Sequence, residues 1–164
     1  MFSTLSRGRR IRPGLAMAAA AIGALSLIST AADAGQCPKD KRGVDVTKPG
    51  ATAPKDVTDT VLTQIDVSKE PAHIEGRLFR MRRLEIKPGG VVPWHSHGDR
   101  PAIIYIIKGT IVEYASNCAV PIVHHAGEAT PEMSGTAHWW KNTGKETVVL
   151  LSADLLHDPK DRNM

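Results

Sequence analysis

The feature that most constrains the fold is a series of short strand-like runs, separated by turns rich in Gly and Pro, from Thr58 onward. The runs are rich in Val, Ile and Thr, and no long stretch repeats its apolar residues with the period of a helix. The pattern predicts an all-β sandwich or barrel. Two of the runs flank Lys108-Gly109 and are expected to form a hairpin. The expected strands cover residues 58–67, 77–87, 91–97, 102–107, 110–114, 121–125, 137–141 and 147–153.

Residues 1–34 are typical of a secretory signal peptide. Arginines precede an apolar segment, Leu15 to Ile28, which is followed by the small residues Ala32-Asp33-Ala34. Arg9-Arg10 is followed by Arg12-Pro13 where apolar residues would be wanted, so the general secretory route is favoured over the twin-arginine route. We therefore expect a periplasmic or secreted protein without a stable membrane anchor after cleavage.

Most of the positive charge belongs to this signal. The whole chain carries a formal net charge of +4, and residues 1–34 contribute four arginines and one aspartate. The remainder is nearly neutral, which argues against a nucleic-acid partner. Residues 35–56 read as an extended arm or loop, and 57–164 as the domain. The cysteines, Cys37 and Cys118, predict a disulfide in an oxidising compartment, with two unrelated thiols as the alternative.

Two histidines one residue apart stand out in the run that ends at residue 97. Because side chains at i and i+2 of a strand point to the same side, His95 and His97 are expected to project together. A third, His138, lies on a separate expected strand. Neutral imidazoles that converge are suitable ligands for a divalent transition metal. A surface pair is the alternative for His95 and His97.

The spacing around these histidines resembles the two motifs of the cupin superfamily. The first motif reads Gly89, five residues, His95-Ser96-His97, four residues, Ala102, six residues, Gly109. The second reads Gly127, five residues, Met133-Ser134-Gly135, two residues, His138, three residues, Asn142. The resemblance spans residues 89–142. It implies a single-domain jelly-roll barrel with one metal ion inside, held by His95, His97 and His138.

The chain departs from the cupin pattern at two positions. Met133 replaces a loop proline, and Ala102 replaces the glutamate that usually supplies the fourth ligand. We therefore expect a neutral three-histidine site without an acidic partner. Resemblance to three-histidine cupins implies a metal-dependent dioxygenase or lyase acting on a small oxygen-bearing molecule. The alternative is a periplasmic protein that binds a metal or small ligand without turnover. The ion could be Fe, Mn, Ni, Zn or Cu.

Other residues are weaker candidates for this site. Asp99, Glu113 and His124 are alternative ligands, and for each a surface or edge-strand position is the simpler interpretation. If Ala102 points inward, so do Ile104 and Ile106, and Trp140 shares the side of His138. These four residues are the pocket candidates. Among Arg80, Arg82 and Arg83, one could point inward and bind a carboxylate. A homodimer is the protein partner we consider.

Overall fold

A computed structural model describes residues 35–157, and the predicted signal peptide at 1–34 lies outside them. The described chain is nearly all strand, which confirms the all-β prediction. No helix in this part of the chain is long and apolar enough to cross a membrane. The elements are η1 (Lys39–Lys41), β1 (Lys55–Asp66), β2 (Leu78–Ser96), β3 (Ala102–Lys108), β4 (Thr110–Ala115), β5 (Ile122–His125), β6 (Ala129–Glu132), β7 (Ala137–Lys141) and β8 (Val148–Leu156).

The long strand β2 belongs to both halves of a curled sheet. Its first part, Leu78 to Ile86, pairs with β1 on one side and β8 on the other. Its last part, Val91 to Ser96, pairs with β7. Two strands separated by a break were expected here, and that expectation is wrong: the chain bends at Pro88-Gly89-Gly90 without leaving the sheet. Gly89 has a φ of +76°, which glycine adopts without strain.

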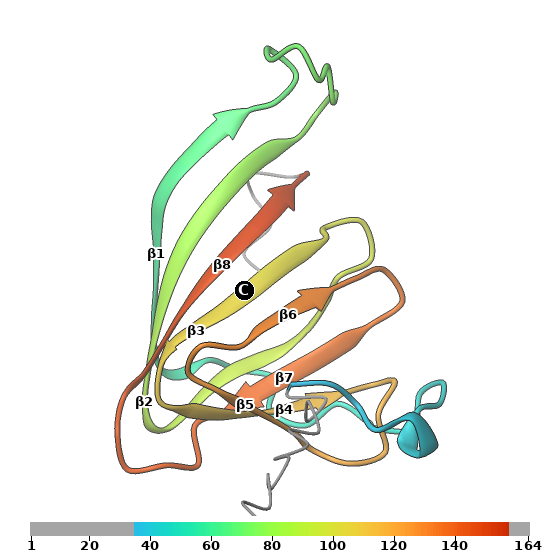
Figure 1. Cartoon of the computed structure of the whole chain (residues 1–164), viewed down its shortest axis with the longest axis vertical. Coiled ribbons are helices and arrows are strands. Elements are labelled where there is room, and N and C mark those ends of the chain that lie inside the picture. Colours follow the sequence, from blue (N-terminus) through green and yellow to red (C-terminus); the bar gives the residue numbers. More distant parts are fainter. Residues whose placement is uncertain (1–34, 158–164) are drawn as a thin grey trace, which may run out of the picture. The chain divides into compact units, whose positions relative to one another are not determined.

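The remaining strands extend the two halves in opposite directions. The order across the sheet is β5-β4-β7-β2-β8-β3-β6, with β1 added to β2. Figure 1 shows β1, β2, β8 and β3 as one layer, with β7, β4 and β5 in a second layer below it. All pairs are antiparallel, as in a jelly roll. The two layers therefore enclose an interior between them.

The expected hairpin on either side of Lys108-Gly109 does not form. Strand β3 pairs with β6 and β8, whereas β4 pairs with β5 and β7, so the chain passes from one layer to the other at Gly109. This glycine has a φ of +86°, and a Cβ there would lie 3.0 Å from Cγ2 of Val148. A turn that changes layers has the same local composition as a hairpin turn, which is why the sequence favoured the wrong pairing.

Strand alternation divides apolar side chains between the interior and the surface. In β3, Ala102, Ile104 and Ile106 are buried, as expected from their spacing, whereas Ile103 and Tyr105 face outward. Burial of each large aliphatic side chain stabilises the fold by about 1.5–3 kcal/mol. The interior cluster consists of Leu84, Ile86, Val92, Ile104, Ile106, Ile111, Trp140, Val148 and Leu150.

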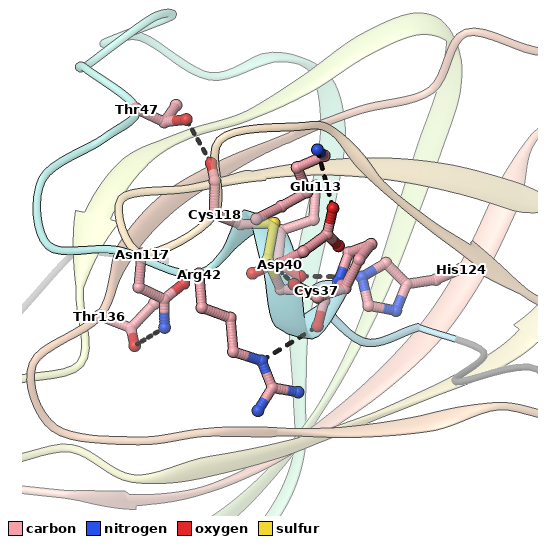
Figure 2. Close-up of a disulfide and its surroundings, with 11 residues drawn as sticks. Cys37, Asp40, Arg42, Thr47, Glu113, Asn117, Cys118, His124 and Thr136 are labelled. Carbon is pink, nitrogen blue, oxygen red and sulfur yellow. Dashed lines mark hydrogen bonds and ion pairs between the residues drawn. A yellow bond between two sulfur atoms is a disulfide. The ribbon is translucent and has the colours of Figure 1, made fainter.

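The N-terminal arm is fastened to the barrel by a disulfide. Cys37 and Cys118 are bonded, which confirms the predicted bridge, and they lie 81 positions apart in the sequence. Figure 2 shows the bridge with the Arg42 side chain folded back toward Cys37, whose carbonyl accepts a hydrogen bond from Arg42 Nε at 3.1 Å. Further along, the Val46 amide donates to Ser116 O at 2.9 Å. The arm is therefore docked along its length.

Candidate metal centre

The three predicted histidines meet inside the barrel. His95 lies near the end of β2 and is paired in register with His138 on β7, and His97 follows β2 directly. Nε2 of His95 is 3.0 Å from Nε2 of His97 and 3.1 Å from Nε2 of His138. All three residues are buried. Strand pairing, rather than sequence proximity, thus brings the distant histidine to the HxH pair.

The outer nitrogen of each ring has a partner that fixes its orientation. Nδ1 of His95 is 2.8 Å from the carbonyl oxygen of Pro93, and Nδ1 of His97 is 2.9 Å from that of Arg100. Nδ1 of His138 is 2.6 Å from Oε1 of Glu113. Since these oxygens only accept, the Nδ1 atoms are donors, and a neutral ring then keeps its lone pair on Nε2. Three Nε2 lone pairs aimed at one another require a cation or a proton between them.

A carboxylate completes the cluster, and it comes from a residue that sequence reasoning missed. Glu132 is buried, with Oε2 at 3.0 Å from Nε2 of His97 and Oε1 at 3.2 Å from Nε2 of His138. Glu132 lies on β6 directly opposite Ala102 of β3. The expectation of a site without an acidic partner is therefore wrong. The neighbouring strand supplies the carboxylate that Ala102 lacks.

Strand β6 was not predicted from the sequence, and for this reason Glu132 was not identified as a candidate. The strand has only four residues, Ala129 to Glu132, and Pro131 is one of them. Proline is tolerated here because β6 lies at the end of the sheet order, where fewer amides are needed for pairing. The available signal was the alternation of Thr130 and Glu132 just before the turn that leads to His138.

Glu113 lies behind the cluster, where it positions a ligand instead of acting as one. It accepts hydrogen bonds from Nδ1 of His138 at 2.6 Å and from Nε2 of His124 at 2.8 Å. Burial alone would raise the pKa of Glu113, but the donors His124 and His138 outweigh it and lower the pKa to about 2. Glu113 and His124 are both buried, so the solvent-facing alternative for Glu113 is wrong, whereas His124 lies on β5 at the end of the sheet order, as the edge-strand interpretation expected.

Asp99 takes no part in the cluster. Its side chain is 62% exposed and pairs with Arg77 at 3.4 Å and with Nδ1 of His157 at 2.8 Å. The turn that follows His97 points this carboxylate outward. Asp99 therefore fastens the turn to the C-terminal end of β8 instead of reaching back toward the histidines.

A small cavity of about 20 Å³ adjoins the cluster. His95, Glu132, Arg82 and Ser152 are its polar lining, and apolar residues form the remainder. Trp140 and Ile104 line it, as their spacing suggested. Ile106 and Ala102 are buried but do not line the cavity: Ile106 packs in the apolar core, and Ala102 faces Glu132 across the strand pair. The space accommodates about one water molecule. The apolar part of the lining is Leu84, Val92, Ile104, Trp140 and Leu150.

Two arginines of β2 point into this interior. Arg80 binds the buried Asp154 through two hydrogen bonds, at 3.0 and 2.7 Å. Arg82 donates to Ser152 Oγ at 3.1 Å and pairs with Asp59, while its Nε has no hydrogen-bond partner among the described residues. Arg83 lies on the opposite face and pairs with Glu85. A positive side chain thus lies at the wall of the cavity beside the histidines.

The pKa values of His95 and His138 are shifted in opposite directions by their surroundings. Burial, and next the neighbouring His138, lowers the pKa of His95 to about 2, so this ring is neutral over the physiological range. Burial also works to lower the pKa of His138, but the carboxylates of Glu132 and Glu113 outweigh it and raise the pKa above its usual value. Of these two rings, His138 is the one whose surroundings favour a proton.

The donor set and its spacing fit a metal ion. One potential donor atom from each of four buried residues lies within 4.8 Å of all the others; the residues are His95, His97, Glu132 and His138. A cation about 2.1 Å from each donor has neighbouring donors about 3.0 Å apart at right angles, and about 3.4 Å apart at tetrahedral angles. Four of the separations between donor atoms are 3.0 to 3.2 Å, at or slightly above the value for right angles. A six-coordinate ion held by these four donors would keep further coordination positions open.

Comparison with known proteins points to one family. The model of the Cupin domain family matches residues 82–154. Germin-like protein 8-14 of Oryza sativa subsp. japonica is 29% identical over 84 residues, which cover 49% of this chain and 39% of the germin-like protein. The chain therefore spans well under half the length of this relative.

Solved structures share the fold. A predicted oxalate decarboxylase from Thermotoga maritima superposes with a TM-score of 0.51 at 24% identity, covering 70% of this chain and 97% of that one. The cupin domain of Schizosaccharomyces pombe Cnp3 superposes with a TM-score of 0.50 at 18% identity, covering 63% and 68%. At these identities the likeness is one of architecture.

Proposed function

Since this chain belongs to the cupin superfamily, we propose that its interior cluster binds one divalent transition metal ion through His95, His97, His138 and Glu132. The observation that supports the proposal most directly is the convergence of three Nε2 lone pairs and a carboxylate in a buried space. Each Nδ1 donates a hydrogen bond to an oxygen atom, so a neutral ring carries its lone pair on Nε2. That lone pair is then available to bind a metal ion.

The spacing of the donors favours a six-coordinate ion such as Mn, Fe or Ni over tetrahedral Zn. Four protein ligands at right angles leave two positions for water or a small molecule. When bound, such an ion supplies Lewis acidity to a coordinated oxygen, or activates dioxygen. The chain's own contribution is to hold His95 neutral, to orient His138 through Glu113, and to keep the surroundings apolar.

We propose a small anionic, oxygen-bearing molecule as the substrate of a metal-dependent dioxygenase or lyase. Arg82 lies on the cavity wall with an unused Nε among the described residues, and Ser152 lies beside it. A guanidinium in a buried site favours a carboxylate or enolate as its partner. Trp140 and Ile104 form part of the apolar wall that such a ligand would contact.

A second candidate is a protein that binds a metal or small ligand without turnover. The size of the cavity favours it, because about 20 Å³ leaves room for little more than one water molecule beside the cluster. A substrate would require Trp140 or Ile104 to move. Among the described residues, the other buried carboxylates near the cluster belong to Glu113 and Asp154. The first is bonded to histidines and the second to an arginine, so neither is free to serve as a general base.

Elemental analysis of the purified protein tests metal binding. We expect about one transition metal ion per chain after loading with Mn, Fe or Ni in the absence of Zn, because Zn generally binds nitrogen and oxygen sites more tightly than Mn or Fe does. His138→Ala should lose the ion. His125→Ala is the matched control, because His125 is exposed and bonds only Thr110 through its ring. A metal-free wild-type protein after reconstitution would contradict the proposal.

Oxygen and product measurements separate the two candidates. The metal-loaded protein is mixed with oxalate and with a panel of diketones, thiols and flavonols, and oxygen uptake and carbon dioxide release are recorded. Turnover of any of these compounds supports an enzyme, and Arg82→Gln should then raise KM for the anionic ones. Absence of turnover across the panel, at one metal ion per chain, favours the binding protein.

We propose that the protein acts outside the cytoplasm. The Cys37–Cys118 disulfide supports this location, because disulfides persist in oxidising compartments. Expression of the full chain in a bacterial host, followed by fractionation and N-terminal sequencing, checks it. The expected result is a periplasmic protein beginning at or near Gly35. Recovery of the uncleaved chain in the cytoplasm would contradict the export proposal.

A further inference from the structure

The first described residues of the arm lie against His124, on the outer side of the proposed metal centre. Gly35 is buried with a φ of +70°, and a Cβ built on it would lie 2.6 Å from Nδ1 of His124. His124 is fully buried and its ring packs on Trp140, with centroids 4.5 Å apart. Only a glycine in this conformation leaves room for the ring, so the backbone at Gly35 limits where His124 can lie.

His124 is linked to a metal ligand through one carboxylate. Its Nε2 donates to Oε2 of Glu113 at 2.8 Å, and Oε1 of Glu113 accepts from Nδ1 of His138 at 2.6 Å. Glu113 therefore has two fixed donors, one from each histidine. If His124 moves, Glu113 loses one of them and gains freedom to rotate away from His138.

The arm also covers the space that leads to Glu113. A cavity of about 370 Å³ lies between arm and barrel; Gly35, Cys37 and Arg42 line it on one side, and Glu113, Ala115 and Ile122 on the other. Figure 2 shows the Cys37–Cys118 bridge in the same neighbourhood as Glu113 and His124. The bridge therefore holds residues 35–37 at the edge of the cavity that Glu113 lines.

Different parts of the arm are held by different bonds. Gly43 and Val46 are bonded through their amides to Asn117 and Ser116, and Ala119 donates to Lys41 O. Residues 35–37, in contrast, are held by the disulfide and by Arg42 Nε, which donates to Cys37 O. Breaking the disulfide should therefore release residues 35–37 first, while the remainder of the arm stays docked.

We infer that the Cys37–Cys118 disulfide and Gly35 are positioning elements of the metal centre, which act on His138 through His124 and Glu113. The inference rests on the proposed metal site. It assigns to the arm the task of holding His124 against Glu113. Loss of a residue that orients a metal-bound histidine typically weakens metal binding about 10–100-fold.

Mn²⁺ affinity, measured by competition with a chelator, tests the inference on the full-length chain. We expect Glu113→Gln to weaken binding about 10–100-fold, and the pair Cys37→Ala with Cys118→Ala to weaken it about tenfold. Gly35→Ala keeps the disulfide and places a methyl group on the His124 ring, so about tenfold is expected there too. This variant keeps the test informative if the protein without the disulfide fails to fold.

Gly89→Ala is the matched control. Gly89 has a similar φ of +76°, but a Cβ there meets no atom within 4 Å and lies outside the arm. The variant should therefore lose comparable stability while keeping the affinity of the wild type. Unchanged Mn²⁺ affinity in both Gly35→Ala and the variant without the disulfide would overturn the inference.

A second readout does not depend on the metal. In the metal-free protein, NMR of ¹⁵N-labelled histidine rings reports whether Nδ1 of His138 keeps a slowly exchanging proton. We expect that proton to be protected in the wild type and in Gly89→Ala, and to exchange at least tenfold faster in Gly35→Ala. Equal exchange in all three would refute the positioning role. If the wild type binds no metal but this difference is seen, the proposed function fails, while the part of the inference that assigns the position of His138 to the arm is supported.

Discussion

Removing the Cys37–Cys118 disulfide should destabilise the domain by an amount that follows from its position. The bridge joins residues 81 positions apart and so closes a loop that covers most of the barrel. In the chain-entropy description, a loop of this length lowers the entropy of the unfolded chain enough to stabilise the fold by about 4.5 kcal/mol. For a domain the size of residues 35–157, this corresponds to a decrease in Tm of about 15–20 °C.

The measurement is thermal unfolding followed by circular dichroism, with the wild type and the Cys37→Ala, Cys118→Ala variant compared under identical conditions. Both samples contain a chelator, because a bound metal ion would stabilise the folded state by mass action and hide part of the difference. Alanine replaces cysteine because both side chains are buried among apolar residues, Ala115 and Ile122, so a polar replacement would leave an unpaired group. Urea unfolding at 25 °C supplies the free energy directly.

A decrease in Tm below about 5 °C would refute this reasoning. It would mean that the unfolded chain gains little freedom when the bridge is absent, or that the bridge strains the fold by as much as it restricts the unfolded state. A decrease well above 20 °C would indicate that residues 35–37 contribute packing to the barrel beyond the entropic effect. The expected range lies between these two results.

Three further outcomes are expected. Glu132→Ala should weaken Mn²⁺ binding at least 100-fold, and adding Ala102→Glu should restore much of it, since the two residues are paired across β3 and β6; a double variant as weak as the single one would contradict this. The pKa of His95 is about 2 when folded, below its unfolded value of about 6.5, so its burial costs stability as pH falls below 6.5; His95→Asn should reduce the loss between pH 6.5 and 5.5 by about 1 kcal/mol in metal-free urea unfolding, and an unchanged slope would contradict the assigned shift. We also expect a homodimer through the outer face of β3, where Ile103 is 59% exposed; light scattering should then give a dimer for the wild type and a monomer for Ile103→Glu, and a monomeric wild type would refute it.

The sequence predicted those parts of the site that depend on alternation along one strand. His95 and His97 share a face because they are two residues apart, and the same rule placed Ile104 and Ile106 inside. The meeting of His138 with this pair followed from resemblance to the cupin motifs. Here the local pattern and the tertiary structure agree.

Other parts depend on which strands become neighbours, and composition carries little information about that. The run around Lys108-Gly109 has the appearance of a hairpin, yet its two strands join different layers. Likewise, the sequence left a solvent-facing position open for Glu113 and favoured an ordinary edge-strand position for His124, because each is polar within a short strand. They are buried because β4 and β5 pair and bring the two side chains together.

The cluster has its glutamate on β6, at Glu132, whereas the cupin motif places one on β3, at the position of Ala102. This difference explains why the motif alone predicted a neutral set of ligands. A motif records residues along one segment, and at Ala102 it shows a missing ligand. A metal ion, however, responds to the position of an oxygen atom and not to the strand that carries it. Because Ala102 and Glu132 are opposite one another in an antiparallel pair, their Cβ atoms lie about 5 Å apart on the same face, within the reach of a glutamate side chain. A missing ligand in one strand is therefore best sought among residues of the same face in the strand beside it.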